Sequence, residues 1–325
     1  MANIGFIQHR LGRTDGVSLE VDKFRAILER NGHTVHYFAG NPDVPGGQFA
    51  EELYPFHPVT QRILQNATRE LKDYPGPAEL LAEVREHADR IKSAMLRFLR
   101  DNQLDLIFPN NLQSVGYNLP GMLALHELIE ETQIPAICHN HDFWWEDSGE
   151  VYPTCPEVIE FYETHAPPVG PNIRHLTINR IAQAELRRRK GVEARVVPNV
   201  FDFQQPAWQA DAFNASFRTD MGLGPNDLYF LQATRILDRK GVELAIDVLA
   251  ELNRPACRRR LESAPLHDGR RFGSGDRIVL VCAGYVEGIG LSGSYQQSLV
   301  DKAAELGVEI LWCGDRIKHS RGQDS

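Results

Sequence analysis

The stretch ATRILDRKG, residues 233–241, follows the apolar run LYFL at 228–231. Together they indicate a strand, a short basic loop and a helix that begins near Gly241. The loop places two cations, Arg235 and Lys240, beside a helix N-terminus, where backbone N–H groups and the helix dipole attract anions. A diphosphate is therefore the ligand that suits this loop, and a solvated basic turn is the alternative interpretation.

A second unit of the same kind opens the chain. Residues 4–8 predict a strand, residues 17–30 an amphipathic helix and residues 34–38 the next strand. This strand–helix–strand order favours a parallel sheet. The intervening loop contains Gly12 and Gly16, which let a backbone approach a ligand closely at a strand end. Because the loop matches neither glycine-rich nucleotide fingerprint, a plain turn is the alternative.

The composition of the 325-residue chain is that of an ordinary globular protein, with 42% hydrophobic and 24% charged residues. The formal net charge of −9 argues against a nucleic-acid-binding protein, whose binding surface is basic. No stretch approaches the length of a transmembrane segment, and the opening apolar run is too short for a signal peptide. The five cysteines are scattered and odd in number, which is typical of reduced thiols and predicts a cytoplasmic protein.

The rest of the chain alternates strands and helices, so we expect an α/β fold with two Rossmann-like domains. Residues 203–226 resemble a connector, which puts an N-terminal domain at 1–202 and a C-terminal domain at 203–325. The C-terminal domain has only three predicted strands and is expected to be incomplete. Residues 253–276 within it predict a polar loop. Further strands are predicted at 104–108, 134–139, 175–178, 194–197, 228–234, 277–283 and 308–313, and further helices at 59–71, 79–102, 121–131, 182–190, 242–252 and 296–306.

A polar and aromatic cluster, HNHDFWWE at 139–146, follows the predicted strand at 134–139. His139 and His141 offer hydrogen-bond donors or bases near neutral pH, and the two tryptophans offer a flat apolar wall. Structural histidines are one alternative. Metal binding by both histidines and a cysteine is another, although the spacing matches no standard zinc motif.

Four pieces, in this order, give the chain a resemblance to a known family. They are the loop of Gly12 and Gly16, the block from Pro135 to Asp142, PNVFD at 198–202, and Arg235 with Lys240 and Gly241. With these pieces the chain resembles a retaining glycosyltransferase of family 4. Members of that family have the GT-B architecture, in which two Rossmann-like domains face each other across a cleft.

The resemblance implies a retaining hexosyltransferase that moves a sugar from a nucleotide diphosphate sugar to an acceptor hydroxyl, without a metal or other cofactor. The N-terminal domain would serve a carbohydrate or other small acceptor, and the C-terminal domain the nucleotide sugar. By matching position, Arg235 and Lys240 would hold the donor diphosphate and stabilise the leaving charge. His141 would lie at the reacting sugar, and Asp142 would orient the acceptor. The further expected contacts are Gly12, Gly16 and Asn199 to the donor and His139 to the acceptor. On their local chemistry alone, Trp144, Trp145 and Glu146 are expected to contact the acceptor or the sugar. Asn199 is otherwise interpreted as a turn residue.

One departure from the family pattern concerns a Glu-x7-Glu motif that its members carry late in the C-terminal domain. The sequence ends before the strands that would carry this motif. Glu243 and Glu251 have the spacing but fall in the helix after Lys240, so we interpret them as part of a helix face. A fragment or a short form is therefore expected. A non-hydrolysing sugar-nucleotide epimerase on the same fold and a non-catalytic nucleotide-sugar-binding fragment stay open as alternatives.

Overall fold

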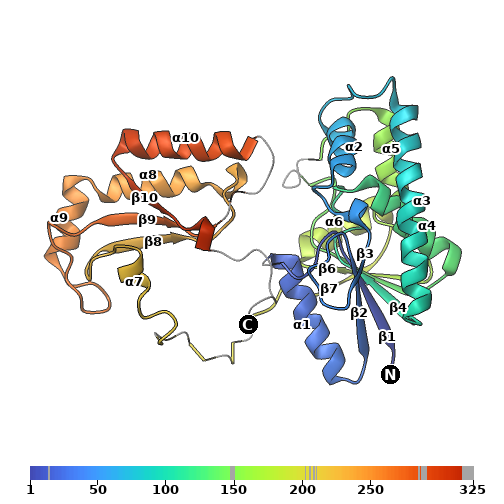
Figure 1. Ribbon diagram of the computed structural model, residues 1–325, viewed down its shortest axis with the longest axis horizontal. Helices are drawn as coiled ribbons and strands as arrows, with labels where there is room; N and C mark the ends of the chain where they lie inside the picture. Colours follow the sequence, from blue (N-terminus) through green and yellow to red (C-terminus); the bar gives the residue numbers. More distant parts are fainter. Residues whose placement is uncertain are drawn as a thin grey trace. The chain divides into compact units, whose positions relative to one another are not determined.

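The computed structural model describes residues 1–13, 15–146, 151–201, 203–204, 206–207, 209, 211–284, 286 and 291–316, with side chains from residue 294 in the last range. The backbone packs into two compact units, Met1–Phe201 and Asp202–Lys318 (Figure 1). Each unit is built on a parallel sheet with helices, which confirms the predicted α/β fold class. Within the described ranges, no helix is both long enough and apolar enough to cross a membrane.

The first unit contains a seven-stranded sheet, in which all neighbouring strands are parallel. The strand order is β3-β2-β1-β4-β5-β6-β7, so the direction of progression reverses between β1 and β4. Such a switch point opens a crevice at the carboxyl ends of the strands, where α/β proteins bind ligands. The strands are β1 (Asn3–Ile7), β2 (Thr34–Ala39), β3 (Gln48–Phe49), β4 (Leu106–Pro109), β5 (Ala136–Asn140), β6 (Ile173–Thr177) and β7 (Ala194–Val196).

Helices cover both faces of this sheet (Figure 1). Successive side chains of a strand point to opposite faces, so each face has a core of its own. Phe6 of β1 packs in one core with Val21 of the first helix. The next residue, Ile7, belongs to the larger core on the other face, which the long third and fourth helices complete. The helices are α1 (Gly16–Arg30), η1 (Glu51–Leu53), α2 (Pro58–Thr68), α3 (Pro77–Asp101), α4 (Leu119–Thr132), α5 (Pro156–His165) and α6 (Arg180–Lys190).

The second unit contains a three-stranded parallel sheet in the order β10-β9-β8. Two helices, α8 and α10, lie side by side over one face of this sheet (Figure 1). Ile246 of α8 and Leu299 of α10 share a buried core with Leu280 of β9. The elements are α7 (Phe217–Asp220), β8 (Leu228–Gln232), η3 (Asp238–Lys240), α8 (Val242–Leu252), α9 (Pro255–Ser263), β9 (Ile278–Cys282), α10 (Leu291–Leu306), β10 (Glu309–Trp312) and η4 (Gly314–Arg316).

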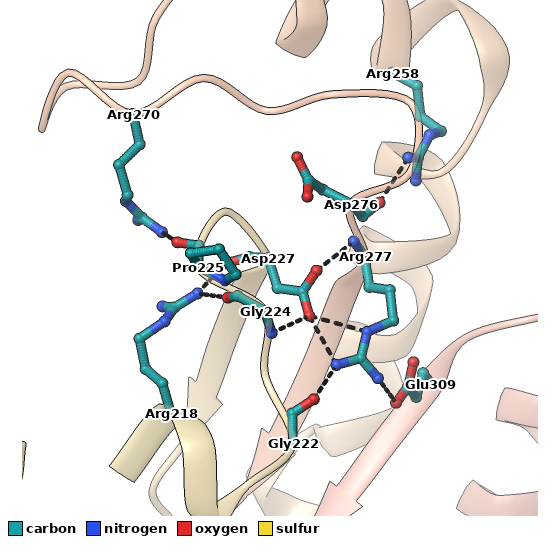
Figure 2. Close-up of polar contacts among 10 residues, drawn as sticks. All are labelled: Arg218, Gly222, Gly224, Pro225, Asp227, Arg258, Arg270, Asp276, Arg277 and Glu309. Carbon is teal, nitrogen blue, oxygen red and sulfur yellow. Dashed lines mark hydrogen bonds and ion pairs between the residues drawn. The ribbon is translucent and has the colours of Figure 1, made fainter. Parts of the chain in front are cut away.

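A charged network joins the amino ends of the three strands of the second unit, and Figure 2 shows it. The Asp227 side chain, 5% exposed, accepts hydrogen bonds from the backbone N–H groups of Gly224 and Arg277, both at 2.8 Å. The Arg277 guanidinium donates to the same carboxylate at 2.7 and 2.9 Å and to Glu309 of β10 at 2.8 Å. Burial alone raises the pKa of Asp227, but these hydrogen bonds and the guanidinium charge outweigh burial and lower it. The network therefore fixes the amino edge of the sheet.

Replacing Asp227 with asparagine is expected to destabilise the second unit by about 2–4 kcal/mol, because one amide cannot accept from every donor that the carboxylate satisfies. Thermal and urea unfolding of the full chain would measure the loss. Asp268→Asn is the matched control, since Asp268 pairs with Arg270 on an exposed loop and its loss should leave the transition unchanged. Equal unfolding midpoints for the Asp227 and Asp268 variants would contradict this account.

The structure corrects the predicted loop at 253–276. Its first part forms helix α9 (Pro255–Ser263), which starts with a proline in its first turn and carries the arginine run RRR at 258–260. Arg258 is part of the helix, where its guanidinium lies 4.9 Å from the ring centre of Phe272 and donates to the carbonyl oxygen of Asp276 at 2.8 Å. The sequence also failed to predict α5, strand β3 and η1. The predicted helix at 59–71 ends three residues earlier, at Thr68.

Candidate active site

Polar side chains gather at the carboxyl edge of the first sheet, although parallel strands covered on both faces are usually lined with apolar residues. They lie on or just after strands β1, β2, β4, β5 and β6, around the switch point. All are at least nine-tenths buried, so the interior here is built for hydrogen bonding. These side chains are Gln8, His9, Asn41, Asn110, Asn111, Gln113, Ser114, His139, Asn140, His141, His175 and Thr177.

The two histidines of the HNHDFWWE stretch lie together at the end of β5, with ring centres 4.2 Å apart. Burial, assisted by the neighbouring His141, lowers the pKa of His139 to about 3, and burial lowers the pKa of His141 to about 4. Both rings are therefore neutral at pH 7. Nδ1 of His139 lies 3.2 Å from Oδ1 of Asn110. Nε2 of His141 is buried and has no hydrogen-bond partner among the described residues, so it is a polar atom that a ligand could satisfy.

Asp142 follows His141 and is held by the loop after β4. The carboxamide of Asn111 donates to Oδ2 of Asp142 at 2.9 Å, and its oxygen accepts from the backbone N–H groups of His141 and Asp142 at 3.0 and 2.9 Å. The side chain of Asp142 is part-exposed. The structure therefore brings His139, His141 and Asp142 into one cluster with an asparagine that was not among the predicted site residues.

The aromatic residues of the stretch differ in their surroundings. Trp144 is 8% exposed, stacks on Tyr162 with ring centres 5.0 Å apart, and donates its Nε1–H to the carbonyl oxygen of Ala166 at 3.2 Å. Its ring thus packs against protein and its N–H group is hydrogen-bonded to protein, as expected of a core side chain. Trp145 is part-exposed, and its ring stacks on Phe143 at 4.5 Å and receives the guanidinium of Arg189 at 5.0 Å.

Glu146 stands at the last described position of this loop. One of its carboxylate oxygens accepts from the N–H of Phe143 at 3.3 Å, which folds the loop back on itself. Burial raises the pKa of Glu146, the hydrogen bond from Phe143 opposes that rise, and the nearby charge of Asp142 adds to it. The carboxylates of Asp142 and Glu146 therefore influence each other.

Residues that follow strand β2 hold the loop of Gly12 and Gly16 in place. Gly12 has φ +75°, and a Cβ there would lie 2.9 Å from the carbonyl oxygen of Asp43, so only glycine fits without movement. Asn41 fastens the loop by accepting from the N–H of Leu11 at 2.9 Å and donating to its carbonyl at 2.8 Å. Gly16 opens α1, and no described atom lies within 4 Å of a Cβ built on it. The two glycines thus do different things: Gly12 allows close packing, and Gly16 leaves open space.

Asn199 is exposed in the segment after β7, which is the last strand of the first sheet. The carbonyl oxygen of the next residue, Val200, accepts a hydrogen bond from Nζ of Lys23 on α1. This bond ties the segment to the first helix. The role predicted for Asn199 in donor binding stays a prediction.

The second unit carries the basic loop as the sequence predicts it, between β8 and α8. Arg235 and Lys240 are both part-buried, and Gly241, with φ +62°, ends η3 and precedes α8. A Cβ on Gly284 would lie 1.6 Å from the carbonyl oxygen of Thr234, so the chain leaving β9 is pressed against the chain leaving β8. The loop therefore starts from a fixed point at the carboxyl edge of the second sheet.

Glu243 and Glu251 lie on α8, as the sequence predicts. Glu243 accepts a hydrogen bond from the hydroxyl of Tyr295 on α10, so it serves helix packing. Among the described residues, no group of three or more His, Cys, Asp or Glu is gathered closely enough to hold a metal ion. The expected independence of a metal stays a prediction.

The sequence missed the amide side chains that build the cluster. Gln113 donates to the carbonyl oxygen of His139 at 3.0 Å and to Oδ1 of Asn140 at 2.9 Å, and Asn140 in turn donates to the carbonyl of Leu176 at 3.0 Å. The signal was the dipeptide Asn110-Asn111 directly after a predicted strand. The pattern showed a polar loop but not that it contacts the end of β5.

Acid is expected to destabilise the first unit through its buried histidines. The pKa of His9 is lowered to about 3 by burial and by Arg10, that of His139 to about 3, and those of His141 and His175 to about 4. Unfolded histidine titrates near pH 6.5. Below about pH 6.5 these histidines are protonated in the unfolded chain but stay neutral in the folded unit. The free energy of unfolding is therefore highest above about pH 6.5 and falls progressively as the pH is lowered.

Urea unfolding at pH 7.5, 6 and 5 would measure this loss as the slope of the unfolding free energy against pH. His175→Gln removes one titrating group and should reduce that slope, whatever it does to stability at pH 7.5. An unfolding free energy that is the same at pH 7.5 and pH 5 would contradict the prediction.

Comparison with known proteins places these two units in a family. Mannosylglucosylglycerate synthase of Thermotoga maritima is 33% identical over 315 residues, which span 97% of this chain and 70% of that protein. The chain belongs to glycosyltransferase family 4. Mannosylglucosylglycerate synthase of Petrotoga mobilis is 31% identical over 320 residues, 97% of this chain and 71% of that protein. This family 4 member is thus a glycosyltransferase that uses a nucleotide sugar.

Solved structures also align with this family 4 chain along most of its length. A structure of an α-glucosyltransferase in complex with UDP-glucose and DNA containing an abasic site is 12% identical, with a TM-score of 0.45, over 96% of this chain and 68% of that one. UDP-GlcNAc 2-epimerase from Neisseria meningitidis bound to UDP-GlcNAc is 10% identical, with a TM-score of 0.47, over 96% and 72%. No family model matches the chain.

Proposed function

We propose that this protein transfers a hexosyl group from a nucleotide diphosphate sugar to a hydroxyl of a small carbohydrate acceptor, with retention of configuration and without a metal. The observation that carries the proposal is the basic loop at the carboxyl edge of the second sheet, in a chain one-third identical to mannosylglucosylglycerate synthase. The name of these relatives favours a mannosyl donor and an acceptor that contains glucosylglycerate.

The second unit binds the diphosphate of the donor in this proposal. Arg235 and Lys240 supply two cations on one short loop, part-buried, at the start of helix α8. Cations held in advance at the leaving diphosphate stabilise the charge that develops as the glycosidic bond breaks, which lowers the barrier to transfer. This electrostatic role is the one that a metal ion serves in other enzymes.

The first unit presents its cluster to the sugar and the acceptor. Neutral His141, whose Nε2 has no hydrogen-bond partner among the residues that the structure describes, donates or accepts one hydrogen bond at the reacting sugar, and Asp142 orients the acceptor hydroxyl. Part-exposed Trp145 and Glu146 stand on the same loop and contact the acceptor, and Gly16 with Asn199 contacts the donor. His139, Gly12 and Trp144 support these side chains through packing and hydrogen bonds.

Two measurements test the function. A thermal-shift screen across UDP-, GDP- and ADP-sugars identifies the donor, because a ligand that binds only the folded chain raises its melting temperature. Mass spectrometry after incubation of that donor with glucosylglycerate, glucose or glycerate then detects the glycosylated product, and NMR of the product gives the anomeric configuration.

The alternatives predict different outcomes of the same assays. An epimerase would convert the donor to an isomer with no acceptor present, and a binding protein would show a thermal shift without any product. Glycosylated acceptor with the anomeric configuration of the donor supports the proposal. An inverted product would overturn the retaining mechanism, and absence of product with every acceptor would overturn the transferase assignment for this chain.

A further inference from the structure

We propose that Asn111 is a positioning residue for glycosyl transfer, which holds the backbone and the carboxylate at the end of β5 in the orientation that the reaction needs. The inference rests on the proposed function. It gives a role to the loop after β4, which stands beside the switch point of the first sheet.

One carboxamide makes all the contacts that this role requires. Oδ1 of Asn111 accepts from the consecutive backbone N–H groups of His141 and Asp142 at 3.0 and 2.9 Å, and Nδ2 donates to Oδ2 of Asp142 at 2.9 Å. Consecutive N–H groups that converge on one oxygen fix the direction in which the chain leaves β5. The carboxylate is fixed by the same side chain, so the backbone and the acid keep one relative orientation.

The backbone of Asn111 is held as tightly as its side chain. Its φ is +60°, a left-handed conformation that asparagine tolerates better than most residues. The other two non-glycine residues with positive φ in the described chain, Gln103 and Gln133, follow the ends of α3 and α4, whereas Asn111 is 6% exposed beside the sheet. Its own N–H donates to the carbonyl of His139 at 3.0 Å. A buried left-handed residue persists where its surroundings hold it, and such residues cluster at functional sites.

One atom of His141 that has no partner among the described residues distinguishes a positioning role for Asn111 from a purely structural role. Nε2 of His141 is buried without a partner in the described part of the chain, and a buried polar atom in that state costs stability. Structural attachment of the same strand end is already provided by Gln113, which bonds the carbonyl of His139 and the side chain of Asn140. Because Gln113 already attaches the end of β5, the hydrogen bonds of Asn111 serve to orient His141 and Asp142.

Asn111→Asp tests the role with almost no change of shape. An oxygen replaces the Nδ2 donor and faces Oδ2 of Asp142, so the two carboxylates repel each other when both are ionised. The pKa of the pair rises because one proton held between them relieves this repulsion. We expect kcat at pH 7.5 to fall about 30- to 100-fold, with the Kd of the nucleoside diphosphate changed less than about threefold. Because a shared proton restores the bond, the loss should shrink as the assay pH is lowered to 6.

Asn111→Gly is the second variant, since glycine adopts φ +60° readily but has no side-chain carboxamide. It should lose kcat to a similar extent and show no recovery at pH 6. Gln133→Gly is the matched control, with the same kind of change at an exposed left-handed residue, and should keep the wild-type kcat.

The outcomes separate this inference from the function on which it rests. Wild-type kcat in both Asn111 variants, in a chain that does transfer sugar, overturns the positioning role and leaves the proposed function intact. Equal losses at pH 7.5 and pH 6 in the aspartate variant, with nucleotide affinity lost in parallel, mean that Asn111 only supports the fold, and also overturn it. A wild-type chain that transfers no sugar overturns both.

Discussion

Replacing Lys240 with alanine is expected to lower glycosyl transfer by about 100- to 1,000-fold, the cost of removing one donor from a site that stabilises developing charge. Arg235→Ala should have a comparable effect, because both cations lie on the loop between β8 and α8. Each substitution should also weaken nucleoside diphosphate binding by about 1.5–3 kcal/mol, the usual worth of a hydrogen bond to a charged group. Calorimetry measures the second effect, and initial rates measure the first.

Arg239→Ala provides the matched control for this prediction. Arg239 lies between the two cations in sequence, so its removal changes the net charge of the loop by the same amount. Unlike them, its side chain is exposed. An exposed charge is screened by salt, and nucleotide affinity should therefore change by less than about threefold. Equal losses in all three variants would mean that only the net charge matters. Unchanged affinity in both the Arg235 and the Lys240 variant would remove the diphosphate assignment.

The second large effect is expected at His141. Its replacement by alanine should reduce kcat by about 100-fold while the Kd of the nucleoside diphosphate stays within about threefold, because the lost hydrogen bond is made at the reacting sugar and not at the diphosphate. Since burial lowers the pKa of His141 to about 4, the ring is neutral throughout the assay range. The wild-type kcat should therefore show no inflection near pH 6.5 that depends on this residue.

His141→Gln separates loss of the hydrogen bond from loss of packing. A glutamine amide can place a donor close to the position of Nε2, so part of the activity should return relative to the alanine variant. Nucleotide affinity that falls while kcat is kept would contradict a place for His141 at the sugar.

The order of elements could be predicted from the sequence because strands and helices alternate regularly in it. The stretch at 228–252 predicts a strand, a basic loop and a helix, and the structure has β8, η3 and α8 there. Helix α9 escaped prediction because its arginine run lacks an apolar stripe, although Pro255 in its first turn was a usable start signal.

Residues of the site were harder to predict for a geometric reason. Asn111 and Asp142 are 31 residues apart, and they meet because β4 and β5 are neighbours in the sheet. Neighbourhood in the sheet is a tertiary property that no local pattern carries. Trp144 shows the same limit, since the sequence cannot tell that its ring stacks on Tyr162 in the core while Trp145, one residue on, stays part-exposed.

The missing side chain of Gly284 has a consequence for anyone who wishes to redesign the specificity of this enzyme. With Thr234 so close, and with Ile236 bridging to Val286, the segments that leave β8 and β9 behave as a single piece. A basic loop transplanted from a relative would therefore have to bring its partner segment with it. Swapped alone, the loop would carry the right charges on a backbone displaced by its new neighbour.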